Sequence, residues 1–186
     1  MVQTSLENKF PLKFIRLNAT ESVKSFDCGN ADLNDFIVNR ATEFQKYMLA
    51  VNYACVNAET GKVYAYCSLA NDKIALDDFK DKTEFNRFRK KRGFPNEKRL
   101  KSYPAVKLCR LGVDKSVKGK QIGTTVIDYI KSMSALDSKA GCRFLTVDAN
   151  LNAVPFYEKN GFQHMSADDN NPHTRLMYFD LKDIAD

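Results

Sequence analysis

The sequence predicts an α/β (α+β) fold in which a single mixed, mostly antiparallel sheet is flanked by helices. Three observations support this prediction. Segments rich in Val, Tyr and Cys flank the turn-like run 57–61, which is typical of an antiparallel hairpin. Apolar residues recur at three- and four-residue spacings between Gln121 and Leu136, which indicates a helix. Strand-like runs stand on both sides of that helix, so strands and helices alternate along the chain.

Each strand is predicted from a local pattern. The alternating apolar and basic residues of Leu12–Leu17 suit a half-buried strand. Phe162–Met165 and Arg175–Leu181 are expected to be the last two strands, separated by a polar loop. The other predicted strands are Val51–Asn57, Val63–Ala70 with an extension to Ile74, Ala105–Val113 and Arg143–Ala149.

Three helices are expected besides the one that starts at Gln121. Asn30 is suited to cap a helix that runs to about Tyr47, because its side chain can accept a hydrogen bond from an unpaired N–H group of the first turn. Phe85 and Phe88 at i, i+3 spacing indicate a short helix that docks its Phe side. Asn152 is predicted to cap a third helix, which Gly161 ends.

The length and composition bound the kind of protein. A chain of 186 residues suits one domain with a real core, so we predict a single domain over 1–186, with 1–11 as a flexible arm. No apolar run approaches the length of a membrane span and the start lacks a secretory signal, which favours a cytoplasmic protein. The five cysteines form no C-x-x-C pair, so we expect neither a disulfide nor a metal site.

The net charge of +6 is concentrated in one segment. Between Lys80 and Lys101, ten Lys or Arg residues oppose three acidic residues, which gives this segment a net charge of +7. We assign it to a basic insert at 77–103. Such a run is either a solvated face or a surface that tracks RNA phosphates, and both interpretations stay open at this point.

The segment 105–123, AVKLCRLGVDKSVKGKQIG, leads from a strand through a short loop into a helix. N–H groups at a helix start are unpaired and carry partial positive charge. Lys118 and Lys120 add full positive charges beside them. A diphosphate is therefore the expected ligand of this loop, although neither the G-x-x-x-x-G-K-[ST] nor the G-x-G-x-x-G pattern is present.

The loop order KGKQIG, residues 118–123, resembles the Q/R-x-x-G-x-G/A acetyl-CoA loop of the GNAT acetyltransferase superfamily. Gln121 stands where that family usually has its middle glycine. We expect the exchange to be tolerated, because a glutamine at a helix start needs no positive φ and can offer its amide to the pyrophosphate. The run 149–162, ANLNAVPFYEKNGF, resembles the fourth-helix region of GNAT enzymes, about thirty residues after the loop.

Two further motifs narrow the resemblance. The runs FDCGN at 26–30 and LNDFI at 33–37 are similar to the F-x-C-G-x-x-x-L-N-x-[FW]-[LI] opening of one GNAT branch. That branch includes toxins that acetylate the amino group of aminoacyl-tRNA. RLGVD at 110–114 is similar to the R-L-A-V-D strand end of the same branch.

The resemblance implies an N-acetyltransferase that uses acetyl-CoA as co-substrate, bound in a cleft that the splayed central strands form. The pantetheine arm would pair with the backbone of Leu111 and Val113, where a strand N–H group can hold the oxyanion. Gly112 would allow its close approach, with a simple bulge as the alternative explanation of this glycine. The implied cofactor-binding residues are Leu111, Gly112, Val113, Lys118, Gly119, Lys120, Gln121, Ile122, Gly123, Thr124 and Asn152.

Tyr157 is the implied general acid, because a phenol held near the sulfur can protonate the departing thiolate of coenzyme A. No general base is evident: Asp114, Glu158 and the two histidines belong to no motif that fixes them in the cleft. An amine of low pKa, such as the α-amino group of an aminoacyl ester, needs little help to lose its proton.

The resemblance to the toxin branch makes aminoacyl-tRNA, bound through the basic segment 80–101, the favoured acceptor, and it implies a small antitoxin as a candidate partner. A second copy of the chain is a further candidate partner. A small-molecule or protein amine remains an alternative acceptor. A non-catalytic module that binds coenzyme A or RNA is the alternative from another functional class.

Overall fold

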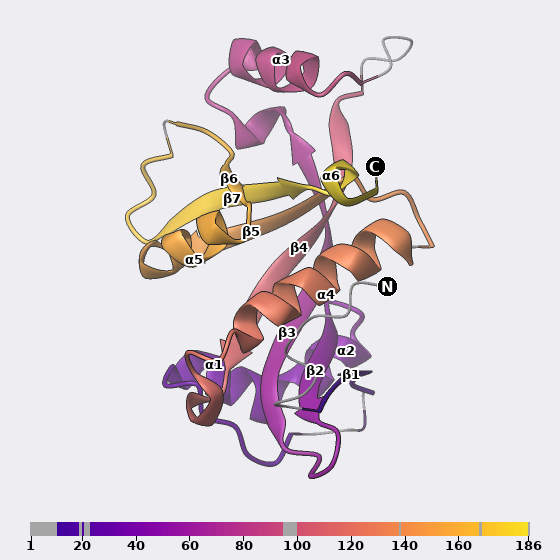
Figure 1. Ribbon diagram of the computed structural model, residues 1–186. Helices are drawn as coiled ribbons and strands as arrows, with labels where there is room; N and C mark the ends of the chain where they lie inside the picture. Colours follow the sequence, from indigo (N-terminus) through magenta and orange to yellow (C-terminus); the bar gives the residue numbers. More distant parts are fainter. Residues whose placement is uncertain are drawn as a thin grey trace. The chain divides into compact units, whose positions relative to one another are not determined.

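The computed structural model describes residues 11–18, 20, 23–94, 100–137, 139–167 and 169–185. The predicted arm lies outside these residues except for Pro11. The elements follow the predicted order (Figure 1). The strands are β1 (Leu12–Arg16), β2 (Val51–Asn57), β3 (Val63–Ala75), β4 (Ser102–Val113), β5 (Phe144–Asn150), β6 (Gln163–His164) and β7 (Thr174–Asp180). The helices are α1 (Ala31–Asp35), α2 (Ala41–Lys46), α3 (Lys82–Lys91), α4 (Ile122–Leu136), α5 (Val154–Lys159) and α6 (Lys182–Ala185), with the short turns η1 (Phe36–Arg40), η2 (Leu76–Asp78), η3 (Lys115–Val117) and η4 (Leu151–Ala153).

The strands form one sheet in the order β1-β2-β3-β4-β5-β7-β6. The pairs β1·β2, β2·β3, β5·β7 and β6·β7 are antiparallel. The central pair β4·β5 is parallel and joins Ala105↔Phe144 through Lys107↔Thr146. The predicted mixed, mostly antiparallel sheet with flanking helices is confirmed, whereas the splay of its central strands stays a prediction.

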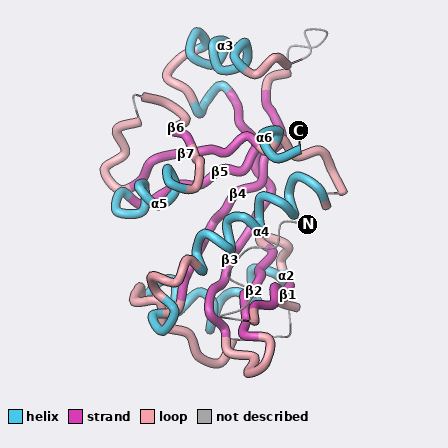
Figure 2. Tube along the Cα trace, viewed as in Figure 1, coloured by secondary structure: helices cyan, strands magenta, loops and turns pink. Residues whose placement is uncertain are grey.

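The chain divides into two compact units, Met1–Ala70 with Cys109–Tyr129 and Asn71–Leu108 with Ile130–Asp186. β3, β4 and α4 are continuous elements that contribute residues to both (Figure 2). The prediction of a single domain over 1–186 stays a prediction.

The first unit is built around a core between β1–β3 and the helical segment 31–46. Phe36, Ile37 and Tyr66 are fully buried there, and Phe26 packs edge-on against Tyr66. Alternation along β1 sends neighbouring side chains to opposite faces of the sheet, so Ile15 joins this core while Phe14 stacks on Tyr129 of α4 with ring centroids 4.0 Å apart.

The helical segment of the first unit begins as predicted. The side chain of Asn30 accepts a hydrogen bond from the N–H of Leu33 over 3.1 Å, and the segment ends at Tyr47. Its middle turn, η1, is a π-helical turn that was not predicted, in which the N–H of Ala41 reaches the carbonyl of Phe36. The turn keeps Ala41 on the same buried face as Phe36 and Ile37.

The second unit has an aromatic core. Phe85 and Phe88 of α3 pack with Phe79, Tyr103 and Phe144, as the i, i+3 spacing predicted. Antiparallel pairing of β5 with β7 extends from Phe144↔Asp180 to Asn150↔Thr174, and these strands contribute Phe144 and Tyr178 to the core. α6 at the end of the chain was not predicted.

Candidate functional site

The end of β4 is shaped by the close approach of aromatic rings to Gly112. A Cβ atom at this position would lie 2.7 Å from a ring carbon of Tyr66, closer than real Cβ contacts, and a tight 3.1 Å from one of Phe26. The flanking residues Leu111 and Val113 are half-buried. Packing of the first-unit core therefore accounts for a glycine here, while its predicted role toward pantetheine and the alternative of a bulge both stay predictions.

After β4, a short turn brings the chain to the phosphate-loop region. Asp114 caps η3, because its Oδ1 accepts from the N–H of Ser116 over 2.9 Å. Val117 is 2 % exposed and anchors the turn in the protein. The N–H of Lys120 then bonds to the carbonyl of Val117 over 3.2 Å, which closes the loop ahead of α4.

The loop has two residues with left-handed backbone conformations. Gly119 has φ +79° and Gln121 has φ +60°. The expectation that Gln121 needs no positive φ is therefore wrong: the chain must reverse into α4 here, and it does so at the position where the family has glycine. A side chain in this region is strained.

The loop presents the donors that an anion requires. Among the described residues, no hydrogen bond uses the N–H groups of Gln121, Ile122, Gly123 or Thr124, which form the start of the 15-residue α4. Ile122 and Gly123 are buried and Thr124 is half-buried, whereas Lys118, Gly119 and Lys120 are exposed. Unpaired amides with two ammonium groups beside them can hold a diphosphate.

Tyr157 is on α5 in the second unit. Its side chain is 7 % exposed and lies edge-on against Phe156 and Phe162, with ring centroids 5.2 and 5.4 Å away. Burial raises the pKa of Tyr157 to about 12. The phenol is therefore neutral at pH 7, the state in which it can donate a proton.

The C-terminal end of α5 is closed by several local contacts. Gly161 has φ +80°, and the N–H of Phe162 donates to the carbonyl of Tyr157 over 3.0 Å. Phe162 is buried and Phe156 half-buried. The helix that carries Tyr157 thus has a fixed end.

Asn152 does not cap α5. The capping residue is Ala153, without a side-chain bond, because the turn η4 precedes the helix and moves its start by one residue. Asn152 lies within η4 and is exposed. The prediction of a helix cap is wrong, while the predicted contact with the cofactor stays a prediction.

Comparison with known proteins supports the resemblance that the motifs indicated. A family model described as an acetyltransferase (GNAT) domain matches residues 97–181. Residues 97–181 therefore correspond to a GNAT acetyltransferase domain. The matched region contains β4, the loop, α4 and α5, and therefore both motifs that carried the resemblance.

Several solved structures resemble this acetyltransferase over nearly its whole length. A tyrosine-to-phenylalanine mutant of KacT is 25% identical with a TM-score of 0.74, covering 94% of this chain and 97% of that one. AtaT complexed with acetyl-methionyl-tRNAfMet is 24% identical with a TM-score of 0.74, at 94% and 97% coverage. A mutant of the toxin AtaT bound to the C-terminus of the antitoxin AtaR and to acetyl-CoA is 22% identical with a TM-score of 0.70, at 93% and 95% coverage. These likenesses confirm the GNAT fold, whereas no curated protein matches the sequence.

The structure distributes the predicted site residues of the acetyltransferase between the two units. Leu111 to Val113 and Lys118 to Thr124 lie together at the junction of β4 and α4 in the first unit. Tyr157 and Asn152 belong to the second unit. The assembly of the two groups into one site stays a prediction.

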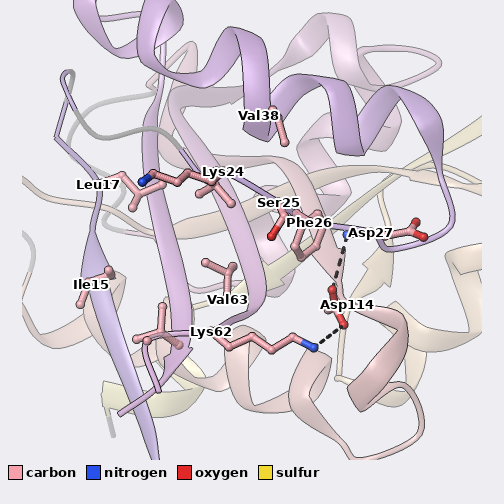
Figure 3. Close-up of a pocket in the computed structure, with 13 residues that line it drawn as sticks. Ile15, Leu17, Lys24, Ser25, Phe26, Asp27, Val38, Lys62, Val63 and Asp114 are labelled. Atoms are coloured by element: carbon pink, nitrogen blue, oxygen red, sulfur yellow. Dashed lines mark hydrogen bonds and ion pairs between the residues drawn. The ribbon is translucent and has the colours of Figure 1, made fainter. Parts of the chain in front are cut away.

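A cavity of about 830 Å³ in the first unit of the acetyltransferase was not predicted. Apolar side chains of β1, β2 and β3 line it, and its polar edge includes Lys62, Asp27 and Asp114 (Figure 3). Its volume lies in the range of small-ligand sites. In the sequence, the FDCGN motif marked this region, because its Asp27 is hydrogen-bonded to Asp114 directly after β4.

The cations of the basic segment are of two kinds. Some are bonded to residues of the second unit, and others are exposed. Arg92 forms an ion pair with Asp180 at 3.5 Å and its side chain is 8% exposed, while the Nε of Arg89 donates to the hydroxyl of Tyr103 over 2.8 Å. Several cations are exposed: Lys80, Lys82, Arg87, Lys90, Lys91 and Lys101. Lys98 and Arg99 lie outside the described residues.

The described part of the acetyltransferase offers neither an evident base nor a metal site. His164 is exposed on β6 with its Nε2 3.0 Å from Glu158, and His173 is exposed just before β7. No group of three His, Cys, Asp or Glu side chains among the described residues could hold a metal ion. Likewise, none of the helices described is long and apolar enough to span a membrane.

Proposed function

We propose that the protein transfers the acetyl group of acetyl-CoA to the amino group of an aminoacyl-tRNA. The observation that carries the proposal is the left-handed loop at Gly119 and Gln121, which leads β4 into the amides at the start of α4. A diphosphate bound there would place coenzyme A beside the end of β4. Support for the acceptor comes from AtaT, which has the same fold and was solved with acetyl-methionyl-tRNAfMet.

The proposed reaction is a direct transfer. The neutral amine attacks the thioester carbonyl, and a strand N–H group near Leu111 to Val113 stabilises the oxyanion. Collapse breaks the C–S bond, and Tyr157 gives its phenolic proton to the leaving thiolate. The amine releases its proton to water and the tyrosine is protonated again by water, so one proton leaves and one is consumed.

The exposed cations of α3 are the proposed contact surface for the tRNA. They belong to an element whose other side is held in the core by Phe85, Phe88 and Arg92. A rigid helix with outward ammonium and guanidinium groups can contact phosphates without reading a sequence. Since both proposed substrates occur in the cytoplasm, we propose the same location for the protein.

The deciding experiment incubates the protein with radiolabelled acetyl-CoA and charged tRNA. Wild type should label the tRNA, and Tyr157→Phe should slow the transfer by about 10²-fold or more. Tyr47→Phe is the matched control, because Tyr47 is 64% exposed and should not affect the rate. Undiminished transfer by Tyr157→Phe would exclude the acid role.

Two other outcomes test the wider proposal. Transfer to free amines but never to tRNA would leave an acetyltransferase of small-molecule or protein amines. Absence of any acetyl-CoA binding would refute the function altogether.

A small antitoxin is the proposed partner, by analogy with AtaR on AtaT, and the product of a neighbouring open reading frame should co-purify with the protein. Homodimerisation, tested by light scattering, stays a prediction.

A further inference from the structure

Asp27 of the FDCGN motif is bonded to the turn that precedes the phosphate loop. The N–H of Lys115 donates to the carbonyl of Asp27 over 2.9 Å, and its ammonium pairs with the Asp27 carboxylate at 2.9 Å. In the other direction, the N–H of Asp27 donates to Oδ2 of Asp114 over 3.4 Å (Figure 3). We infer that Asp27 is a positioning residue for the acetyl-CoA loop, an inference that rests on the proposed function.

Asp27 is itself held by the start of α1. Its Oδ1 accepts from the N–H of Gly29 over 2.9 Å and from the amide of Asn34 over 3.0 Å. The carbonyl oxygen of Asn34 accepts in turn from the N–H of Cys28 over 2.9 Å and from its thiol over 3.1 Å. The motif residues therefore form one local network that fixes the direction of the Asp27 carboxylate.

Asp114 provides a second attachment on the loop side. Its Oδ1 accepts from both the N–H and the hydroxyl of Ser116, over 2.9 and 2.5 Å. Lys62, from the turn between β2 and β3, donates to the Ser116 hydroxyl over 2.8 Å. The end of β4 is thereby tied to two other segments of the first unit.

The attachment continues into the loop through backbone bonds. The N–H of Val117 donates to the carbonyl of Asp114 over 3.1 Å, and that of Lys118 to the carbonyl of Lys115 over 3.3 Å. Lys120 then bonds back to Val117. A displacement of Asp114 or Lys115 would therefore also displace Gly119 and Gln121, the two residues with left-handed backbone conformations.

The exposure of the Asp27–Lys115 ion pair allows a positioning role to be distinguished from a structural one. The side chains of Lys115 and Asp27 are 59% and 57% exposed, and an exposed ion pair contributes little to global stability. Loss of the pair should leave the fold intact. Its effect should therefore appear in the binding of a ligand that needs several loop amides in register.

The test measures acetyl-CoA binding by calorimetry and steady-state kinetics on the full chain. Asp27→Asn should raise the Kd and the KM for acetyl-CoA about five- to tenfold, with kcat and the melting temperature nearly unchanged. Lys115→Met should have the same effect, and Lys115→Arg should restore wild-type binding because it keeps the ion pair. Asp32→Asn is the control, since Asp32 pairs with Arg40 instead.

Each result decides between the two proposals. Failure of wild type to bind acetyl-CoA would refute the proposed function. Normal binding by wild type together with an unchanged or lower Kd in Asp27→Asn would overturn the inference alone. A lower melting temperature with an unchanged Kd would also overturn it, because it would show a purely structural role.

Discussion

The ammonium of Lys131 donates to the main-chain carbonyl of Asn160 over 2.6 Å. Lys131 is 8% exposed, and its Nζ lies 3.9 Å from the ring centroid of Phe179. A cation at this place satisfies a carbonyl at the C-terminal end of α5, where the helix dipole is negative. The lysine of α4 thus holds the end of the short helix that carries Tyr157.

Lys131→Met should lower the free energy of unfolding by about 1–2 kcal/mol. The change removes a buried charge-assisted hydrogen bond, and the apolar methionine recovers part of the loss. Urea denaturation followed by circular dichroism measures this change in the free energy of unfolding. Lys159→Met, an exposed position on α5, should change the stability by less than about 0.5 kcal/mol, and an equal loss in both variants would contradict the role of Lys131.

Gly112→Ala should destabilise the protein by about 1–3 kcal/mol, because the new methyl group would overlap the rings of Tyr66 and Phe26. Gly141→Ala is the matched control, since nothing lies within 4 Å of a Cβ atom there. Thermal and urea unfolding of both variants provide the comparison. A stable Gly112→Ala protein would show that the rings can move aside.

Gln121→Gly should not destabilise the protein and should raise the free energy of unfolding by up to about 1 kcal/mol. Glycine adopts a φ of +60° without the strain that a side chain incurs, although it adds entropy to the unfolded chain. Gln121→Val should be destabilising, because a β-branched residue fits this region poorly. The opposite order of the two variants in urea unfolding would contradict the observed backbone conformation.

The two kinds of cation in the basic segment should respond differently to substitution. Replacing Lys82, Arg87 and Lys91 together by Gln should weaken tRNA binding and make the slope of log K against log salt shallower by about two to three, without loss of stability. Arg92→Met should instead destabilise the fold by about 2 kcal/mol or more, because it breaks a buried ion pair with Asp180.

A control with equal charge completes that experiment. Replacing the exposed Lys13, Lys46 and Lys73 by Gln removes three charges elsewhere on the protein. Filter binding at several salt concentrations should give a nearly wild-type slope for this variant. Equal weakening in both triple variants would indicate that net charge, rather than the α3 surface, controls binding.

Tyr157 should make the protein less stable at alkaline pH. Burial raises its pKa from 10.0 to about 12, so between these values the unfolded chain loses this proton while the folded chain keeps it. The folded state then binds more protons, and the free energy of unfolding falls as pH rises. Between pH 9 and 12 the free energy of unfolding should fall less steeply for Tyr157→Phe than for wild type. The exposed Tyr47→Phe variant should match wild type.

The strands, the capped first helix and the docking of α3 could be predicted because their signals are local. The side chain of Asn30 caps the turn beside it, and Phe85 and Phe88 are one helical turn apart. The left-handed conformation of Gln121 could not be predicted, because it is imposed by the path from β4 to α4 and not by the glutamine itself. Asn152 failed as a cap because η4 intervenes between β5 and α5.

Only those residues of the candidate site that belong to a sequence motif could be predicted. The loop and Tyr157 were found in this way, whereas the bonds of Asp27 to Asp114 and Lys115 join residues that are 87 and 88 positions apart. Arg92 and Lys131 were missed for a similar reason. Charged side chains are expected at the surface, and only the fold shows that these two are buried.

The π-helical turn η1 sets how the first helical segment tolerates changes of length. Each residue of an α-helix rotates the chain by about 100°, so five residues of regular helix would turn Ala41 about 140° away from Phe36. The wider turn absorbs this excess and keeps both residues in the core. Deleting one residue within 37–40 would leave a regular helix whose later part keeps its inward face. The first helix is therefore a place where a homologous sequence can differ by one residue in length while preserving the fold.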